Sequence, residues 1–198
     1  MRTILITLFA LILCTNNIFS QINIIPTGGL QLSNQIASDK SGRFIDNPRI
    51  GYTVGVLIEY KVSKELAIES GLMLNTKGGH TEFDIANTTM ESKTNLLYVD
   101  LPLCLKGTIP TANITTIFGG YIAYGISRKI EKGNNTIKNW DNFNRFESGL
   151  RIGVATTRKE KFTISAYWNI GLLKTNNDST DIRTTNNSVA ITLGYRIF

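Results

Sequence analysis

The last eleven residues decide the fold: Ser188-Val189-Ala190-Ile191-Thr192-Leu193-Gly194-Tyr195-Arg196-Ile197-Phe198. Apolar side chains take every second position from Val189 to Ile197, and mostly small or polar side chains take the positions between them. This alternation is typical of a strand with one apolar face. An outer-membrane β-barrel needs such a final strand, because the last strand pairs with the first and closes the sheet. We therefore predict that Tyr195 and Phe198 belong to the signal that barrel-assembly machinery reads.

The first 20 residues have the order of regions found in a secretory signal peptide. Arg2 supplies a positive charge, residues 4–13 are apolar apart from Thr7, and a polar stretch ends at Ser20. The apolar run is shorter than the roughly 20 residues that a membrane-spanning helix needs. We therefore expect cleavage after Ser20, with residues 21–198 forming a single outer-membrane β-barrel domain.

Charge and cysteine content narrow the choice of partners and compartment. The chain carries a formal net charge of +6, and removal of the signal peptide takes away Arg2 and no acid, which leaves +5. Because no nucleic-acid-binding motif accompanies this charge, we expect no nucleic-acid partner and favour anionic lipid head groups instead. Cys104 is the one cysteine of the mature chain, so no intramolecular disulfide is expected.

Period-two alternation recurs eight times along the chain. Each segment has about the 9–11 residues that a tilted strand needs to cross the hydrocarbon layer. The expected strands are Ile24–Ser33, Ile50–Tyr60, Leu66–Thr76, Asn95–Lys106, Ile114–Ile126, Asn144–Thr156, Phe162–Leu172 and the terminal stretch 188–198.

Long and short connections alternate between these strands. The long ones are Asn34–Arg49, Lys77–Thr94, Ser127–Phe143 and Lys174–Asn187, and the short ones are Lys61–Glu65, Gly107–Asn113 and Thr157–Lys161. This arrangement is typical of outer-membrane barrels, with long loops outside and tight turns in the periplasm. The sequence therefore predicts an all-β, eight-stranded, antiparallel up-and-down transmembrane barrel in a Gram-negative outer membrane. A soluble barrel or sandwich explains the alternation equally well, but not the polar residues on the face it would pack.

Seven charged residues fall on the face that would line the lumen: Glu59, Glu69, Asp100, Lys106, Glu147, Arg151 and Arg196. An eight-stranded barrel has room for side chains and little else, and an unpaired buried charge is costly. We therefore expect an ion-pair network that plugs and stiffens the barrel, with Asp100 and Arg151 as candidate partners and Lys61 joining at the periplasmic rim. A polar conduit or a catalytic carboxylate pair is the alternative.

Aromatic residues stand near the expected ends of the strands. Tyr52 and Tyr60 are separated by about 20 Å of height on a tilted strand. This spacing predicts two girdles at the membrane interfaces. We place Tyr52, Tyr124 and Phe146 in the outer girdle and Tyr60, Phe162 and Tyr195 in the inner one. Ordinary aromatic enrichment in strands is the alternative.

Constellations that support catalysis or metal binding are mostly missing. His80 is the only histidine and follows Gly78 and Gly79 in an expected loop. A Ser-His-Asp site would need this histidine beside an acid and a nucleophile, and no Cys or His cluster has metal-ligand spacing. We therefore expect no enzymatic activity, metal or cofactor, and we read His80 as a solvated loop residue.

Four stretches of the sequence resemble the signatures of a known family. They are Gly71-Leu72-Met73-Leu74-Asn75-Thr76-Lys77-Gly78-Gly79, Leu97-Tyr98-Val99-Asp100-Leu101-Pro102-Leu103-Cys104-Leu105-Lys106, Asn144-Arg145-Phe146-Glu147-Ser148-Gly149-Leu150 and Leu193-Gly194-Tyr195-Arg196-Ile197-Phe198. In this order they are similar to motifs of the PorT-type outer-membrane β-barrel family, in which a Tyr-x-acid-x-Pro-Leu strand follows a Gly-Leu…Lys-Gly strand. One departure is Ile197, which puts Tyr195 and Phe198 on opposite faces.

The resemblance implies an eight-stranded outer-membrane barrel but not one activity. The founding member of the family is tied to a secretion and gliding apparatus, and most relatives have no assigned role. We expect a monomeric, non-enzymatic barrel whose loops meet an unknown protein partner or support envelope integrity. The alternatives are a narrow channel, an accessory component of an outer-membrane secretion apparatus and, more distantly, a hydrolase that depends on His80.

Overall fold

A computed structural model gives the structure of the protein. It describes residues 21–38, 42–85, 88–132, 135–141, 143–176 and 183–197. The expected signal peptide and Phe198 lie outside these ranges, and both stay predictions. Across the described ranges, no helix is long and apolar enough to cross a membrane.

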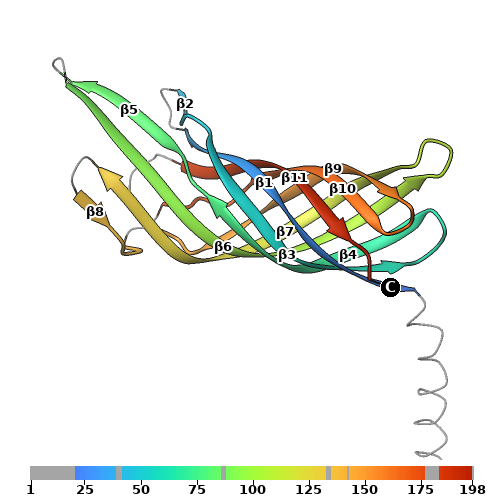
Figure 1. Ribbon diagram of the computed structural model, residues 1–198. Helices are drawn as coiled ribbons and strands as arrows, with labels where there is room; N and C mark the ends of the chain where they lie inside the picture. Colours follow the sequence, from blue (N-terminus) through green and yellow to red (C-terminus); the bar gives the residue numbers. More distant parts are fainter. Residues whose placement is uncertain are drawn as a thin grey trace, which may run out of the picture.

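Eight long strands form a closed antiparallel barrel (Figure 1). They are β1 (Ile22–Ser38), β3 (Arg49–Lys61), β4 (Leu66–Lys77), β6 (Thr88–Ile109), β7 (Ile114–Lys132), β9 (Phe146–Arg158), β10 (Phe162–Gly171) and β11 (Arg183–Tyr195). Their order around the barrel is β6-β4-β3-β1-β11-β10-β9-β7, and the pairing of β6 with β7 completes the ring. The prediction of an eight-stranded up-and-down barrel is confirmed.

The first and last strands close the sheet as the sequence predicts. β1 pairs with β11 from Thr27 opposite Gly194 to Ser38 opposite Arg183. Beyond β11, the amide of Ile197 donates to the carbonyl oxygen of Ile24 at 2.9 Å. The two ends of the described barrel are therefore held together by main-chain hydrogen bonds.

Three short strands extend the sheet beyond the barrel: β2 (Arg43–Ile45), β5 (His80–Ile85) and β8 (Asn135–Ile137). β5 pairs with β6 and β8 with β7, and the two hairpins project past one end of the barrel in Figure 1. The expected loops 77–94 and 127–143 thus contain strand, and β6 and β7 reach 22 and 19 residues. Beyond the membrane both faces of a strand meet water, so the apolar alternation that marks a membrane strand is lost there.

The short connections lie at the opposite end, near the described carboxyl end of the chain (Figure 1). They join β3 to β4, β6 to β7 and β9 to β10. In the last of them Arg158 pairs with Phe162, and Lys159 and Glu160 have positive φ angles of 50° and 58°, as tight hairpin turns require. Short turns mark the periplasmic end of an outer-membrane barrel, so the projecting hairpins face the outside of the cell.

The outward face of the barrel is apolar and exposed. Leu72, Leu103 and Ile191 have 59%, 61% and 61% of their surface exposed, although each lies on a barrel strand. Exposure of such a continuous apolar surface to water is unfavourable, whereas contact with the hydrocarbon layer of a membrane is favourable. Aromatic residues meet near its periplasmic end, where the rings of Phe162 and Tyr195 are edge to face at 5.3 Å.

Candidate functional site in the charged lumen

Two groups of charged side chains occupy the lumen. The periplasmic cluster consists of Glu59, Glu69, Lys106 and Arg196. The central cluster consists of Lys77, Asp100 and Glu147, together with the neutral Tyr121 and Asn186. Arg151 lies apart from both clusters, against Asn169 and Tyr167.

The periplasmic cluster is built around two carboxylates on neighbouring strands. Glu59 of β3 and Glu69 of β4 stand directly opposite each other in the register. The ammonium of Lys106, on β6, lies 2.6 Å from Glu59 Oε2 and 2.8 Å from Glu69 Oε2. Arg196 Nη2 adds a contact of 2.8 Å to Glu59 Oε1. Like charges directly opposite each other destabilise a sheet, so the two cations offset the repulsion between Glu59 and Glu69.

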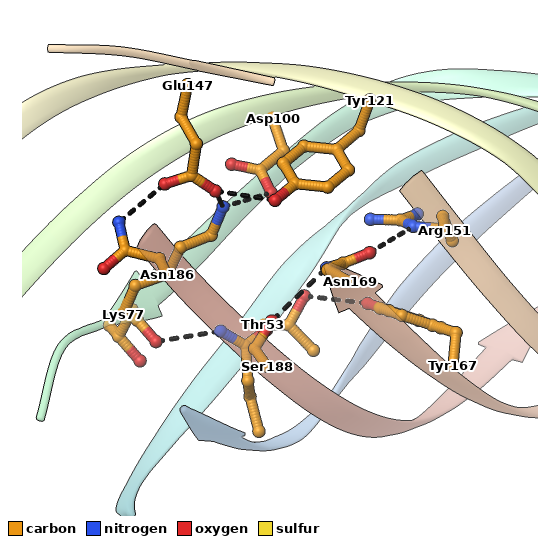
Figure 2. A network of polar contacts seen from close by, with 12 residues as sticks. Thr53, Lys77, Asp100, Tyr121, Glu147, Arg151, Tyr167, Asn169, Asn186 and Ser188 are labelled. Atoms are coloured by element: carbon orange, nitrogen blue, oxygen red, sulfur yellow. Dashed lines mark hydrogen bonds and ion pairs between the residues drawn. The ribbon is translucent and has the colours of Figure 1, made fainter. Parts of the chain in front are cut away.

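The central cluster joins strands from separate parts of the barrel wall (Figure 2). Lys77 Nζ lies 2.7 Å from Glu147 Oε1 and 3.2 Å from Asp100 Oδ2. Tyr121 donates its hydroxyl hydrogen bond to Glu147 Oε1 at 2.7 Å, and Asn186 Nδ2 donates to Glu147 Oε2 at 2.7 Å. Lys77 is on β4 and Glu147 on β9, with β6 and β7 between them in the sheet. The lysine therefore spans the lumen.

Aromatic rings complete the surroundings of Lys77. Its ammonium lies 4.9 Å from the centre of the Tyr98 ring and 4.7 Å from that of Tyr121. A cation over a ring face gains electrostatic stabilisation, most of all where water is excluded. Tyr121 reaches this position because Gly149 faces it, and a Cβ at Gly149 would lie 2.6 Å from the ring.

Arg151 makes contacts other than the expected one. Its Nε donates to Asn169 Oδ1 at 2.8 Å, and its guanidinium lies 4.3 Å from the centre of the Tyr167 ring. In place of the pairing of Asp100 with Arg151 that we expected, Asp100 pairs with Lys77. Inter-strand register decides such pairings, and a single sequence does not contain it.

Lys77 is the luminal residue that the sequence analysis assigned to a loop. The inward positions of β4 are odd-numbered and include Glu69, Met73 and Asn75, and one further step in the same alternation reaches Lys77. Lys61, which we placed at the rim, is exposed at the end of β3. The lumen thus contains four acids and four bases among the described residues, and Lys77 is the base that was not expected there.

An aromatic cluster lies above the central cluster, toward the extracellular end. Trp140 meets Tyr98 edge to face, with ring centres 6.2 Å apart, and Phe143 follows at 5.9 Å from Trp140. Gly125 lies beneath Trp140, where a Cβ would be 2.1 Å from the indole. Arg128 donates to the carbonyl oxygen of Asn139 at 2.9 Å. The segment after β8 is therefore packed over the lumen.

Some buried polar atoms of the lumen have no hydrogen-bond partner within the protein. Both amide atoms of Asn75 are in this state, as are Gln31 Oε1 and Arg151 Nη2. Buried polar groups are costly unless they are hydrogen-bonded, and ordered water commonly serves them. The filling of the lumen is thus polar and incompletely paired.

Other residues singled out in the sequence lie away from this network. The backbone of His80 pairs with that of Asn47 at 2.8 and 3.1 Å, so the histidine begins strand β5 rather than lying in a loop. Cys104 is buried and unbridged. Tyr195, half of the expected assembly signal, lies on the lipid face with 42% of its surface exposed. Among the described residues, no group of His, Cys, Asp and Glu is arranged to hold a metal ion.

The closed sheet, the apolar outer face and the charged interior define a transmembrane β-barrel of the outer membrane. A family model described as "Outer membrane protein beta-barrel domain" matches residues 16–177. The chain belongs to this family, and it is located in the lipid of the outer membrane. No curated protein matches the chain.

Solved structures of outer-membrane barrels are similar to the chain in fold. Neisserial surface protein A is 10% identical, with 87% of this chain and 95% of that chain covered and a TM-score of 0.50. The attachment invasion locus protein Ail of Yersinia pestis is 10% identical, with 88% and 99% covered and a TM-score of 0.48. The N-terminal barrel domain of Pseudomonas aeruginosa OprF is 8% identical, with 85% and 97% covered and a TM-score of 0.35. At these identities the likeness to Neisserial surface protein A shows the fold alone.

Proposed function

We propose that the protein is a monomeric, non-enzymatic barrel with a lumen closed by side chains. Its extracellular strands present a surface for a protein partner or support envelope integrity. The observation that carries the closed lumen is the central cluster, in which Lys77, Asp100 and Glu147 have at most 1% of their side-chain surface exposed. An ion that crossed the barrel would have to displace these paired charges.

The extracellular strands supply the second part of the proposal. β5, β6, β7 and β8 form a sheet that continues beyond the barrel (Figure 1). Rigid strands hold a recognition surface in place at lower entropic cost than long loops do. Replacing residues 82–91 with an Asn-Gly turn would shorten the β5–β6 hairpin, because Thr81 and Ser92 stand opposite each other. We expect normal assembly, together with loss of a cross-linked partner or increased sensitivity of the cells to detergent. If intact cells show neither change, this surface has no such role.

Conductance measurements test the closed lumen. The barrel is reconstituted in planar lipid bilayers at neutral pH, and insertion is verified by heat-dependent gel mobility of the same preparation. We expect no discrete current steps from the wild-type barrel. Reproducible steps would overturn the proposal in favour of a channel.

A narrow channel is the second candidate, and the unpartnered polar atoms of Asn75, Gln31 and Arg151 favour it. A file of water that served these atoms would also be a path for small ions. The resemblance to the PorT-type family supports a further role as an accessory component of a secretion apparatus. Hydrolytic activity that disappears in a His80→Ala variant would overturn the non-enzymatic proposal.

A further inference from the structure

Apolar side chains face the lumen between the two charged clusters. Six of them form what we call the apolar layer: Ile25, Leu57 and Met73 on β1, β3 and β4, and Cys104, Ile117 and Ala155 on β6, β7 and β9. Met73 lies between Glu69 and Lys77 along β4, so it separates a residue of the periplasmic cluster from a residue of the central cluster. Cys104 has the equivalent place on β6, between Lys106 and the central cluster.

The two strands without a member of the apolar layer, β10 and β11, are covered by other means. A Cβ at Gly194 of β11 would lie 2.7 Å from Cγ2 of Ile25, so Ile25 covers the wall at this glycine. Tyr167 of β10 reaches across the lumen, because its hydroxyl lies 3.4 Å from Oγ1 of Thr53 on β3. The apolar layer thus meets covered wall on its remaining side.

The apolar layer leaves no room for water. Each of its six side chains faces inward, yet each residue has at most 8% of its surface exposed. A water-filled path along the lumen would expose inward-facing side chains at every level. From the periplasm a cavity of about 380 Å³ reaches Glu59, Lys106 and Arg196, and Ala155 is the one residue of the apolar layer that lines it. This periplasmic vestibule therefore ends at the apolar layer.

An ion meets different obstacles at the charged clusters and at the apolar layer. Paired side chains can exchange partners and take over part of the hydration shell of an ion, whereas apolar side chains replace none of it. An unpaired charge in apolar surroundings is very costly, and hydrophobic constrictions close pores by excluding water. The unpartnered atoms of Asn75, Gln31 and Arg151 lie on the extracellular side of the apolar layer. Water that served these atoms would not continue to the periplasm.

We propose that the apolar layer, and not the central cluster, is the seal that stops ions in the lumen. It divides the interior into a vestibule open to the periplasm and a separate polar compartment that contains the central cluster. This inference rests on the proposed closed lumen and names the residues that close it. The ion pairs of the central cluster then hold the wall together and are dispensable for the seal.

Conductance of variants in planar lipid bilayers tests the seal. Leu57→Ser with Met73→Ser makes the apolar layer polar, and Lys77→Gln with Glu147→Gln removes the ion pair of the central cluster. Leu96→Ser is the matched control, because Leu96 is a buried apolar residue at 2% exposure outside the apolar layer. We expect current steps from the first variant and none from wild type or the other two. Heat-dependent gel mobility verifies folding, and Met73→Gln, which nearly keeps the side-chain volume, replaces a first variant that does not fold.

Labelling of single cysteines by a charged methanethiosulfonate gives a second readout, with the barrel in lipid nanodiscs that leave both ends open. In a Cys104→Ala background, Thr157→Cys places a thiol in the vestibule. Thr192→Cys places one beyond the apolar layer, on the inward face of β11, where Thr192 is 4% exposed. We expect labelling of Thr157→Cys but not of Thr192→Cys, and labelling of Thr192→Cys once Leu57→Ser and Met73→Ser are added.

Three results would overturn the inference. Current steps from the central-cluster variant, or a folded apolar-layer variant that stays closed, would place the seal elsewhere and leave the closed lumen intact. Labelling of Thr192→Cys with an unchanged apolar layer would show that the vestibule continues past it. Steps from the wild-type barrel would overturn the closed lumen as well, so the protein that conducts tells the two failures apart.

Discussion

Lys77 and Glu147 form an ion pair across the lumen, with Lys77 Nζ 2.7 Å from Glu147 Oε1. Two strands separate β4 from β9, so this contact ties together parts of the wall that share no main-chain hydrogen bond. A buried ion pair adds little net stability compared with apolar residues of the same shape, but the loss of one partner leaves an uncompensated charge. The ion pair therefore fixes the position of β4 relative to β9 rather than adding much net stability.

Replacement of Lys77 should be costly. We expect Lys77→Met to lower the free energy of unfolding by about 3–5 kcal/mol, because Glu147 and Asp100 would remain buried without their cation. Urea unfolding of the barrel in lipid vesicles, followed by tryptophan fluorescence, measures this loss.

Lys129→Met provides the matched control. Lys129 pairs with Glu131 in the part of β7 beyond the barrel, and its side chain is 46% exposed. Exposed pairs contribute little to stability, so this variant should unfold close to the wild-type urea concentration. Equal effects of the two substitutions would contradict a structural role for the central cluster.

The cost of replacing Lys106 should depend on its two acidic partners, Glu59 and Glu69. Lys106→Met leaves Glu59 and Glu69 opposite each other with Arg196 as their remaining cation, so we expect a loss of about 3–5 kcal/mol in unfolding free energy. Adding Glu69→Gln removes the repulsion and should restore part of that loss. A double-mutant cycle in urea measures the coupling between Lys106 and Glu69, and strictly additive effects would show that these two side chains act independently.

The barrel could be predicted from the sequence because apolar and polar residues must alternate along a membrane strand. That alternation is visible from Ile50 to Tyr60 and in the other seven segments. It also placed Glu59, Glu69 and Lys106 on the inward face, since facing follows from the same period. The sequence could not show which of the luminal charges pair with one another. Whether Asp100 meets Arg151 or Lys77 depends on strand register and shear, which arise from the closed sheet as a whole.

The strands outside the membrane were missed for a related reason. Residues 127–132 of β7 continue the pairing with β6, but a shift of register near Leu97 and Tyr98 leaves Ile126 without an opposite residue. Such a bulge changes which side chains face inward, and Arg128 consequently turns toward Asn139. A bulge interrupts the two-residue period, so the alternation in the sequence breaks off at a point where the strand itself continues.

The two tryptophans should respond differently to lipid. Trp168 lies on the lipid face with 50% of its surface exposed, whereas Trp140 packs against Tyr98 and Phe143. In vesicles with brominated acyl chains we expect Trp140→Phe to keep the quenching of fluorescence and Trp168→Phe to lose it. Quenching that survives in Trp168→Phe would place Trp140 against the acyl chains and contradict its position over the lumen.

Depth in the membrane should govern the cost of a charge on the outer face. Leu101 and Ile58 have similar exposed fractions, 41% and 47%, but Leu101 is near the middle of β6 and Ile58 is two residues before the girdle residue Tyr60. An arginine costs about 2–4 kcal/mol at the bilayer midplane and about 0–1 kcal/mol near an interface. Leu101→Arg should therefore lower the unfolding free energy far more than Ile58→Arg, because the guanidinium at Ile58 reaches the periplasmic head groups.

Serine substitutions at the same two positions separate the cost of a charge from the cost of lost packing. Leu101→Ser and Ile58→Ser remove apolar surface without adding a charge, so their costs should differ much less than those of the arginine variants. The four unfolding free energies are measured in urea in vesicles of one lipid composition. If Leu101→Arg and Ile58→Arg cost the same, depth has no effect, and these residues do not face a bilayer in the arrangement that the barrel gives them.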